Sequence, residues 1–354
     1  MITTIKSTKI NTLQAIRAFA AIGVMLFHGA DMINDRLGYL FLNNIFMAGF
    51  SGVDVFFVLS GFIILYTSSL ANYDVASFLK RRFIRIYPIY WLVTIFLVVA
   101  FVFSPSPDQA YKGDIWVILG SLTLLPQAHT IVGVAWTLSY EVVFYLVFAF
   151  TYFKKPIFLL FAFIAWISAI LLFYFLQIKT DIFIVNALMH PVILNFAFGC
   201  VVAFLYKKYP NAANFKWFFW VGALLFISLW ALFYQLRTSN AEAFTSDMAR
   251  VYLFGLPAAI LIFGALYLPV LVPKLLVHLG DASYAIYLIH GTVLSVLIKL
   301  VLKFNLAALF SHFMGAMALF AATLFIGSCF YRFIEQPLLK WLNTVTNKVQ
   351  YQLA

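Results

Sequence analysis

The sequence predicts an all-α integral membrane protein, a bundle of about ten transmembrane helices with one short partial helix. Of its 354 residues, 65% are hydrophobic and 10% are charged, whereas soluble domains average about 45–50% and about 25%. Apolar runs of roughly 17–25 residues, each long enough to cross about 30 Å of hydrocarbon as a helix, recur along the whole chain. They leave no room for a soluble domain, so a single membrane domain over residues 1–354 is expected.

The first apolar run is predicted to be an uncleaved span. It follows Lys6 and Lys9 and precedes HGADMIND, which lacks the small-x-small cleavage site of a signal peptide. The stretch 114–126, DIWVILGSLTLLP, is too short and polar-flanked for a span, so it is predicted to be a partial or re-entrant helix on the outer side. In order, the predicted spans are residues 12–31, 48–70, 86–104, 133–153, 156–176, 182–206, 217–236, 250–272, 282–302 and 311–333.

Basic residues set the predicted orientation. With a cytoplasmic N-terminus, sixteen of the 23 Lys and Arg residues fall on the inner side, which satisfies the positive-inside rule and places both termini in the cytoplasm. A net charge of +11 spread over loops is explained by this topology, so nucleic-acid binding is not expected. The seven outer cations are Arg36, Lys112, Lys179, Arg237, Arg250, Lys299 and Lys303.

An arginine and a histidine share one face of the first predicted helix. Arg17 and His28, the ends of RAFAAIGVMLFH, are eleven residues apart, which in an α-helix is three turns plus about 20° and about 16.5 Å. Either residue alone can be explained as an interfacial anchor. Together they are candidates for functional groups at opposite depths of one helix.

Two carboxylates fall inside predicted spans. Asp54, in GVDVFFVLSGF, lies about two turns inside the second span, and Glu141, in WTLSYEVVFYL, lies roughly eight residues inside the fourth. An acid in hydrocarbon is costly unless it is paired or wetted, so both are candidate site residues. The alternative is that each carboxylate only bonds a polar group of a neighbouring helix.

A basic cluster precedes the third predicted span at its inner end. FLKRRFIRIYPIYW holds Lys80, Arg81, Arg82 and Arg85. Such a cluster is a topology signal and a contact for anionic lipid. Guanidinium forks also suit phosphates, so a phosphorylated ligand entering from the cytoplasm would meet this cluster and Arg17.

Arg17 and His28 are followed in order by the motifs GVDVFFVLSGFII, RRFIRIYPIYW, WTLSYEVVFYL, LGDASYAIYLIHG and FYRFIEQPL. This set resembles the acyltransferase-3 family of membrane acyltransferases over nearly the whole chain, and most closely the branch that acetylates exopolysaccharides. The resemblance implies an enzyme of the bacterial cytoplasmic membrane. It would acylate extracytoplasmic carbohydrate, usually with acetyl from cytoplasmic acetyl-CoA, through a bundle of about ten helices.

The resemblance implies roles for residues already singled out. Arg17 and His28 are the expected essential pair, and Glu141 ends the family's Trp-x-x-Ser-x-Glu element. The expected catalytic residues are His28, Glu141 and Asp54, and the expected contacts to coenzyme A are Arg17, Arg81, Arg82 and Arg85. The expected substrate-binding residues are Ser60, Trp136, Ser139, Tyr287 and His290. Two positions depart from the family pattern, because Asn195 stands where an acid is expected and Tyr140 replaces a small aliphatic residue.

Three further residues have structural alternatives. His290 follows Tyr287 at helical spacing, which predicts a polar helix face, but a packed, hydrogen-bonded histidine would fit the same pattern. Glu335 lies just past the last predicted span and can pair with Arg332 three residues earlier. His190, beside Pro191, is expected to be structural.

The expected partners are a carbohydrate acceptor, free or lipid-linked, and membrane lipid. Only about twenty residues follow the last predicted span, so no appended soluble domain is expected. The acceptor would then be met by the membrane domain itself or through a partner protein of polysaccharide biosynthesis. Cys200 and Cys329 both fall in apolar runs and indicate neither a disulfide framework nor a metal site.

Acyl transfer from a thioester needs a base, stabilisation of an oxyanion and positioning of both substrates. We expect His28 either to deprotonate a sugar hydroxyl or to carry the acetyl group in a two-step route. Glu141 or Asp54 would orient its ring. The rival reading is a transporter or flippase for a glycan or small anion, because intramembrane ionisable groups also mark permeation paths. The absence of a repeat and of paired broken spans in the sequence disfavours it.

Overall fold

The computed structural model describes residues 10–70, 74–105, 107–178, 180–240 and 247–352. Within them the chain is helical, with no strand, and ten segments are long and apolar enough to cross a membrane. The expected multi-pass helical bundle is therefore confirmed. Lys6, Lys9 and Lys179, which entered the charge count, lie outside the described residues.

The ten spanning segments combine α-helices with short 3-10 and π turns. They are α1 (Asn11–Leu37), η1 (Phe41–Ser51) with α2 (Gly52–Leu70), α3 (Val75–Phe103), η3 (Gly133–Ala135) with α5 (Trp136–Tyr152), α6 (Pro156–Phe175), α7 (Phe183–Leu188) with η4 (Pro191–Ile193) and α8 (Leu194–Lys208), η5 (Ala213–Lys216) with α9 (Trp217–Asn240), α10 (Asp247–Arg250) with η7 (Val251–Gly255) and α11 (Leu256–Ala265), α13 (Ser283–Lys303), and α15 (Phe313–Phe330) with η8 (Tyr331–Glu335) and α16 (Gln336–Gln352). The shorter connecting helices are η2 (Pro107–Gly113), α4 (Ile115–Thr123), α12 (Lys274–Asp281) and α14 (Ala307–Phe310).

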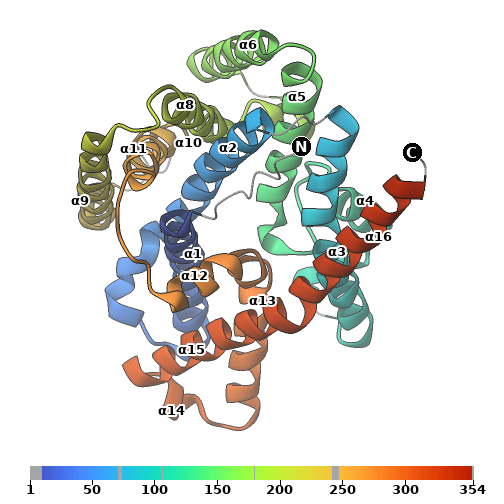
Figure 1. The fold of residues 1–354 in the computed structure, drawn as a ribbon. Coiled ribbons are helices and arrows are strands. Elements are labelled where there is room, and N and C mark those ends of the chain that lie inside the picture. Colours follow the sequence, from blue (N-terminus) through green and yellow to red (C-terminus); the bar gives the residue numbers. More distant parts are fainter. Residues whose placement is uncertain (1–9, 71–73, 106, 179, 241–246, 353–354) are drawn as a thin grey trace.

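Helices α1, α2 and α13 lie towards the middle of the bundle, and α6 and α9 lie at its edge (Figure 1). In the most apolar window of Phe41–Leu70, 72% of the residues are buried, compared with 17% in Pro156–Phe175 and 11% in Ala213–Leu236. A helix that is apolar on all sides but unburied by protein must face lipid. The bundle therefore presents α6 and α9 to the membrane and keeps α2 inside.

The contact between α2 and α8 depends on two glycines. A Cβ atom at Gly61 would lie 2.1 Å from the carbonyl oxygen of Phe196, and one at Gly199 would lie 2.0 Å from that of Val58. Neither distance is sterically possible, so only glycine allows these two backbones to approach so closely. Small residues are the usual means of close helix packing in membranes, where no hydrophobic force drives helices together.

Several predicted boundaries are wrong, some by more than ten residues. Helix α1 continues to Leu37 instead of ending near residue 31, and α3 begins at Val75 instead of residue 86. Asp74 caps α3 by accepting a hydrogen bond from the Ser77 backbone N–H at 2.9 Å, and its bonds to Ser77 hold the pKa of the Asp74 carboxyl below its ordinary value. The basic cluster therefore lies within the helix, where its side chains have a fixed angular order. The short α4 agrees with the partial helix predicted at 114–126.

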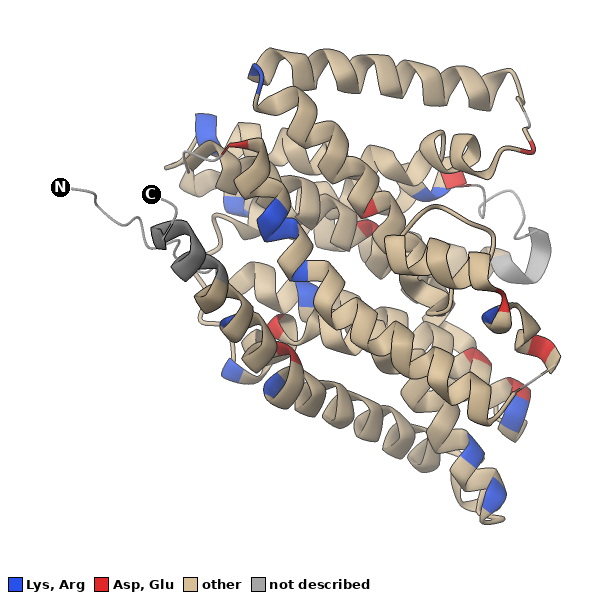
Figure 2. Ribbon diagram, turned by 90° about the vertical axis from the view of Figure 1, so that its right-hand side faces the viewer, with Lys and Arg blue, Asp and Glu red and all other residues tan. Residues whose placement is uncertain are grey.

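The described end of α1 that begins at Asn11 and the start of α16 lie at the same end of the bundle, on the left in Figure 2. Many of the Lys and Arg residues are drawn near this end, and few charged residues occupy the middle of the bundle. We refer to this end as the arginine end and to the other as the far end. The predicted assignment of the arginine end to the cytoplasm stays a prediction.

Candidate active site

A cavity of about 210 Å³ lies between α1, α2, α3, α5 and α13. Its polar lining comes from residues that are distant in sequence but converge in the bundle. Apolar side chains of α2, α3 and α5 complete the wall. The polar lining residues are Arg17, Ser60, Arg82, Arg85, Thr137, Glu141, Tyr145, Ser283, Tyr284 and Tyr287.

Arg85 is held in the cavity wall by Glu335, an acid near the C-terminal end of the sequence. Its Nη1 donates to Oε1 of Glu335 at 2.8 Å, and its guanidinium lies 5.3 Å from the centre of the Tyr284 ring. Glu335 is fully buried, and its Oε2 has no hydrogen-bond partner among the described residues. The side chain of Arg85 is 34% exposed. The cavity therefore has an open, cationic side at the arginine end.

Arg17 and Arg82 add two further guanidinium groups to this cavity. Arg17 Nη1 donates to Gln14 Oε1 at 3.4 Å, a weak bond within α1. The Arg82 guanidinium lies 5.4 Å from the Phe78 ring centre and 5.7 Å from that of Tyr145, and its buried Nε has no partner in the described part of the chain. The three arginines outnumber the acids at this cavity, which among the described residues are Glu335, paired with Arg85, and Glu141 in the lining. The cavity therefore has an excess of positive charge.

Glu141 faces this cationic cavity from α5. Its Oε1 accepts hydrogen bonds from the Ser60 hydroxyl, at 2.7 Å, and from the Tyr145 hydroxyl one turn later on the same helix. Glu141 and Ser60 are both partly exposed to the cavity that they line. The predicted catalytic acid and the predicted substrate-binding serine therefore lie together.

A pair of hydroxyl groups closes the cavity towards the far end. Tyr287 and Thr137 share a hydrogen bond of 2.9 Å between their hydroxyl oxygens, and the Tyr287 hydroxyl also donates to the Val134 carbonyl at 3.3 Å. Phe56 packs edge-on against the Tyr287 ring at 5.8 Å. These residues separate the cavity from the next turn of α13.

His28 lies beyond this closure and meets the second predicted histidine. The rings of His28 and His290 are stacked, with centroids 5.3 Å apart and planes at 29°. His290 is 1% exposed, and its Nδ1 is 2.7 Å from the Tyr287 carbonyl oxygen. His28 is partly exposed. One turn of α13 thus joins the cavity residue Tyr287 to the histidine pair.

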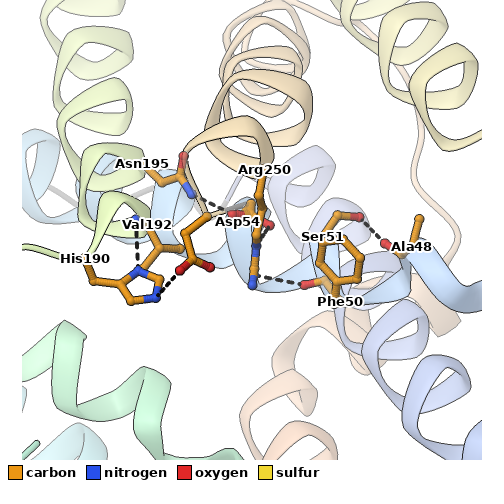
Figure 3. A network of polar contacts seen from close by, with 9 residues as sticks. Ala48, Phe50, Ser51, Asp54, His190, Val192, Asn195 and Arg250 are labelled. Carbon is orange, nitrogen blue, oxygen red and sulfur yellow. Dashed lines mark hydrogen bonds and ion pairs between the residues drawn. The ribbon is translucent and has the colours of Figure 1, made fainter. Parts of the chain in front are cut away.

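Asp54 belongs to a separate, enclosed network (Figure 3). Its two oxygens accept from Asn195 Nδ2 at 2.7 Å and from Arg250 Nε at 2.8 Å, and the side chain is fully buried. Arg250 Nη2 also donates to the Phe50 carbonyl at 3.3 Å. The structure thus favours the alternative left open for Asp54, a carboxylate that bonds polar groups of neighbouring helices.

The amide at Asn195, where an acid was expected, has a structural role in this network. Its Nδ2 donates to the Asp54 carboxylate, which an ionised acid at the same position cannot do. A second carboxylate would also repel the first. The departure at Asn195 is therefore compatible with a closed Asp54–Arg250 pair.

Two cavities open at the far end of the bundle. One of about 490 Å³ has a largely aromatic and amide lining that includes Tyr111, Gln127, Trp136, Tyr140, Asn186 and His190. The other, of about 340 Å³, is lined by residues that include Phe27, Asp31, Asp247 and Arg250. His190 Nε2 and Asp247 Oδ2 lie 3.2 Å apart and connect the two linings.

The structure does not bring all predicted site residues together. Arg81 is exposed on α3 and is not part of the cavity lining, and Ser139 is 3% exposed and lines none of the three cavities. Trp136 lines the far-end cavity instead of the one with Glu141. Among the described residues, no hydrogen bond joins Glu141 or Asp54 to the His28 ring, and the expectation that either carboxylate orients His28 stays a prediction.

Tyr145 and Thr137 were missed by the sequence reasoning. Tyr145 lies four residues after Glu141 and Thr137 four residues before it, so a helical-face argument from Glu141 alone would have found both. Arg250 was counted only as an outer cation, and its pairing with Asp54 had no local signal because 196 residues separate them.

Comparisons with known proteins identify relatives along most of the chain. The family described as an acyltransferase domain matches residues 10–332. The exopolysaccharide production protein ExoZ of Rhizobium meliloti is 30% identical over 335 residues, which are 89% of this chain and 95% of that protein. No solved structure matches the chain.

Two other relatives match shorter segments. Acyltransferase MdmB of Streptomyces mycarofaciens is 32% identical over 155 residues, 41% of this chain and 39% of that protein. O-acetyltransferase OatA of Staphylococcus aureus is 30% identical over 161 residues, 38% of this chain and 23% of that protein. From the family match over residues 10–332 and the similarity to ExoZ over nearly its full length, this chain belongs to the acyltransferase-3 family of membrane acyltransferases.

Proposed function

We propose that this protein is an O-acyltransferase of a bacterial cytoplasmic membrane that moves acetyl from acetyl-CoA to a hydroxyl of a cell-surface or exopolysaccharide glycan, or of its lipid-linked precursor. One observation supports it most strongly. A cavity with three arginines at its cationic side reaches Glu141 and ends one helical turn from the histidine pair. The names of ExoZ and OatA support exopolysaccharide and O-acetyl chemistry.

The cavity fits part of a coenzyme A thioester. Pockets for whole drug-sized ligands occupy about 300–1,000 Å³, so a volume of about 210 Å³ suits the narrow acyl-pantetheine arm and not the nucleotide. The phosphates would stay at the arginine end, where Arg17, Arg82 and Arg85 supply bidentate donors. The distance of about 16.5 Å along α1 from Arg17 to His28 suits an extended arm.

The transfer itself needs one proton acceptor. His28 takes the proton of the acceptor hydroxyl while the hydroxyl oxygen attacks the thioester carbonyl carbon, and the C–S bond then breaks. The departing thiolate of coenzyme A receives the proton from His28, which restores neutral imidazole. For the acyl group to reach His28, the Tyr287–Thr137 closure must open, because it separates the cavity from the histidine pair.

The far-end cavity of about 490 Å³ supports a carbohydrate acceptor. Its rings, Trp136, Tyr140 and Tyr111, can stack on the apolar faces of a sugar, and its amides and histidines can bond hydroxyl groups. Helix α5 lines both this cavity, through Trp136, and the cavity that contains the three arginines, through Thr137. We refer to the latter as the donor cavity. Donor and acceptor would therefore approach the same turn of α5 from opposite ends.

The proposal is tested by transfer of labelled acetyl from acetyl-CoA into glycan by membranes that contain the protein. Wild type is compared with His28→Ala, with Arg85→Ala and with the control His278→Ala, whose histidine lies on α12 and lines none of the three cavities. We expect His28→Ala to lose transfer, Arg85→Ala to raise the KM for acetyl-CoA, and the control to match wild type at equal abundance.

Two results would contradict the proposal. Equal transfer by wild type and His28→Ala would make His28 an interfacial residue. Movement of glycan across the membrane without consumption of acetyl-CoA would identify a transporter. A rapid-quench search for acetyl on the protein before acceptor is added separates direct transfer from the two-step route, in which His28 carries the acetyl group.

A further inference from the structure

The partner of His28 in this structure is a second histidine. His290 Nδ1 lies 2.7 Å from the Tyr287 carbonyl oxygen, which can only accept, so Nδ1 carries the hydrogen. The other nitrogen, Nε2, is buried and has no hydrogen-bond partner among the described residues. A proton on Nε2 would create a buried charge without a partner, which is strongly unfavourable. His290 is therefore a neutral imidazole with a free lone pair at Nε2.

The His290 ring that carries this lone pair stacks on the ring of His28. The two ring centroids are 5.3 Å apart, and His290 is enclosed whereas His28 is partly exposed. His290 is therefore closed to an acceptor hydroxyl, whereas part of His28 is accessible. Rotation of an imidazole about its terminal torsion has broad, shallow minima, so a turn of the His28 ring can direct one N–H to His290 Nε2.

We propose that His290 is the positioning residue of His28, with its Nε2 accepting a hydrogen bond from a His28 ring nitrogen. This inference rests on the proposed function. The bond fixes the His28 tautomer so that the other nitrogen presents its lone pair to the acceptor hydroxyl. When His28 takes the hydroxyl proton, the same bond holds the imidazolium until the proton passes to the departing thiolate. A neutral imidazole thus does what a carboxylate does in many histidine-based sites.

Three substitutions at residue 290 separate this role from packing. His290→Gln places an amide oxygen near the position of Nε2, and His290→Met has a similar length and shape but only a weakly accepting sulfur. Both are good helix formers. His290→Asn can keep the bond to the Tyr287 carbonyl but does not reach the Nε2 position. We expect His290→Gln to retain most of the transfer rate, and His290→Met and His290→Asn to lose about 10²-fold in kcat through misorientation of His28.

The KM for acetyl-CoA should stay unchanged in all three variants, because the arginines of the donor cavity are untouched. In a His28→Ala background, the same substitutions should have no further effect on the residual rate, since His290 acts through His28. Melting temperatures of the purified variants in detergent identify any that fail to fold. If His290→Asn fails, the transfer rates of His290→Gln and His290→Met are compared with each other.

Two outcomes would overturn the inference. One is equal activity of His290→Gln and His290→Met, and the other is an unchanged effect of His290→Asn when His28 is already alanine. A wild-type protein that transfers no acyl group from a thioester would instead overturn the proposed function and, with it, the role of His290. The two failures are distinguishable because only the second abolishes the wild-type rate.

Discussion

Two carboxylates inside this bundle have different environments, one open to a cavity and one enclosed. Glu141 shares its carboxylate with two hydroxyl donors and lines a cavity, whereas Asp54 is fully buried between Asn195 and Arg250. Removing one partner of a buried ion pair leaves an uncompensated charge, so a structural pair tolerates little change. A carboxylate that faces a cavity keeps the freedom to meet a substrate.

Glu141→Gln separates charge from shape at the open site. The amide oxygen can still accept from Ser60 and Tyr145, so the fold should be retained, but the negative charge opposite the arginines is lost. We expect about a 10²-fold lower kcat for acetyl transfer with normal abundance, as for loss of a catalytic ionisable group. An unchanged kcat would show that Glu141 acts only as a neutral hydrogen-bond acceptor.

Asn195→Asp tests the closed site. The new carboxylate would face the Asp54 oxygen that now accepts from Asn195 at 2.7 Å, so we expect destabilisation by about 1–3 kcal/mol. The measurement is the melting temperature in detergent. The swap Asp54→Asn with Asn195→Asp restores one acid and one amide, and it should recover part of the loss. A single Asn195→Asp variant as stable as wild type would mean that the new acid is accommodated as its neutral form.

At the scale of elements, local departures from α-geometry occur beside the ion pairs. The π segment η7 directly follows Arg250, and the π segment η8 ends on Glu335. A π turn inserts an extra residue and shifts the side chains around it, and such turns are frequent at functional sites. The pairs Arg250–Asp54 and Arg85–Glu335 therefore each have one partner beside a helix irregularity, and the periodicity of the sequence does not reveal it.

Gly199→Ala should weaken the contact between α2 and α8. Its Cβ would lie 2.0 Å from the backbone oxygen of Val58, which can move only with the helix, so a cost of about 1–3 kcal/mol is expected. The matched control is Gly291→Ala in α13, where nothing lies within 4 Å of the added atom. There the better helix propensity of alanine should be neutral or stabilising by up to about 1 kcal/mol. Equal melting temperatures of the two variants would contradict the packing argument.

At the scale of the whole molecule, the site is polar at both ends and closed in the middle. The donor cavity and the far-end cavities are separated by the Tyr287–Thr137 closure and the histidine pair. Under the proposed function, the turn of α13 from Tyr287 to His290 lies between the donor and the acceptor. Under that function, the orientation of the bundle also decides whether a cytoplasmic donor can reach the arginine end.

The orientation can be measured by cysteine labelling. In a background with Cys200 and Cys329 replaced by alanine, single cysteines are placed at two exposed positions, Arg81 at the arginine end and Asp108 beyond the other end of α3. A membrane-impermeant maleimide should label Asp108→Cys in spheroplasts and Arg81→Cys only after permeabilisation. The reverse pattern would place the arginines outside the cell and remove the proposed route for a cytoplasmic thioester.

The sequence alone determined the number of spans, the short α4 segment and the sharing of one helix by Arg17 and His28, because hydrophobic length and helical period are local properties. It also supplied most of the polar residues that converge, among them Arg82, Arg85 and Glu141. Only the tertiary structure decided which of them meet. Asp54 pairs with Arg250 and His28 stacks on His290, across separations of 196 and 262 residues. Such partners are chosen by the packing of helices, since a buried polar group bonds whatever the neighbouring helix presents, and no local pattern encodes that neighbour.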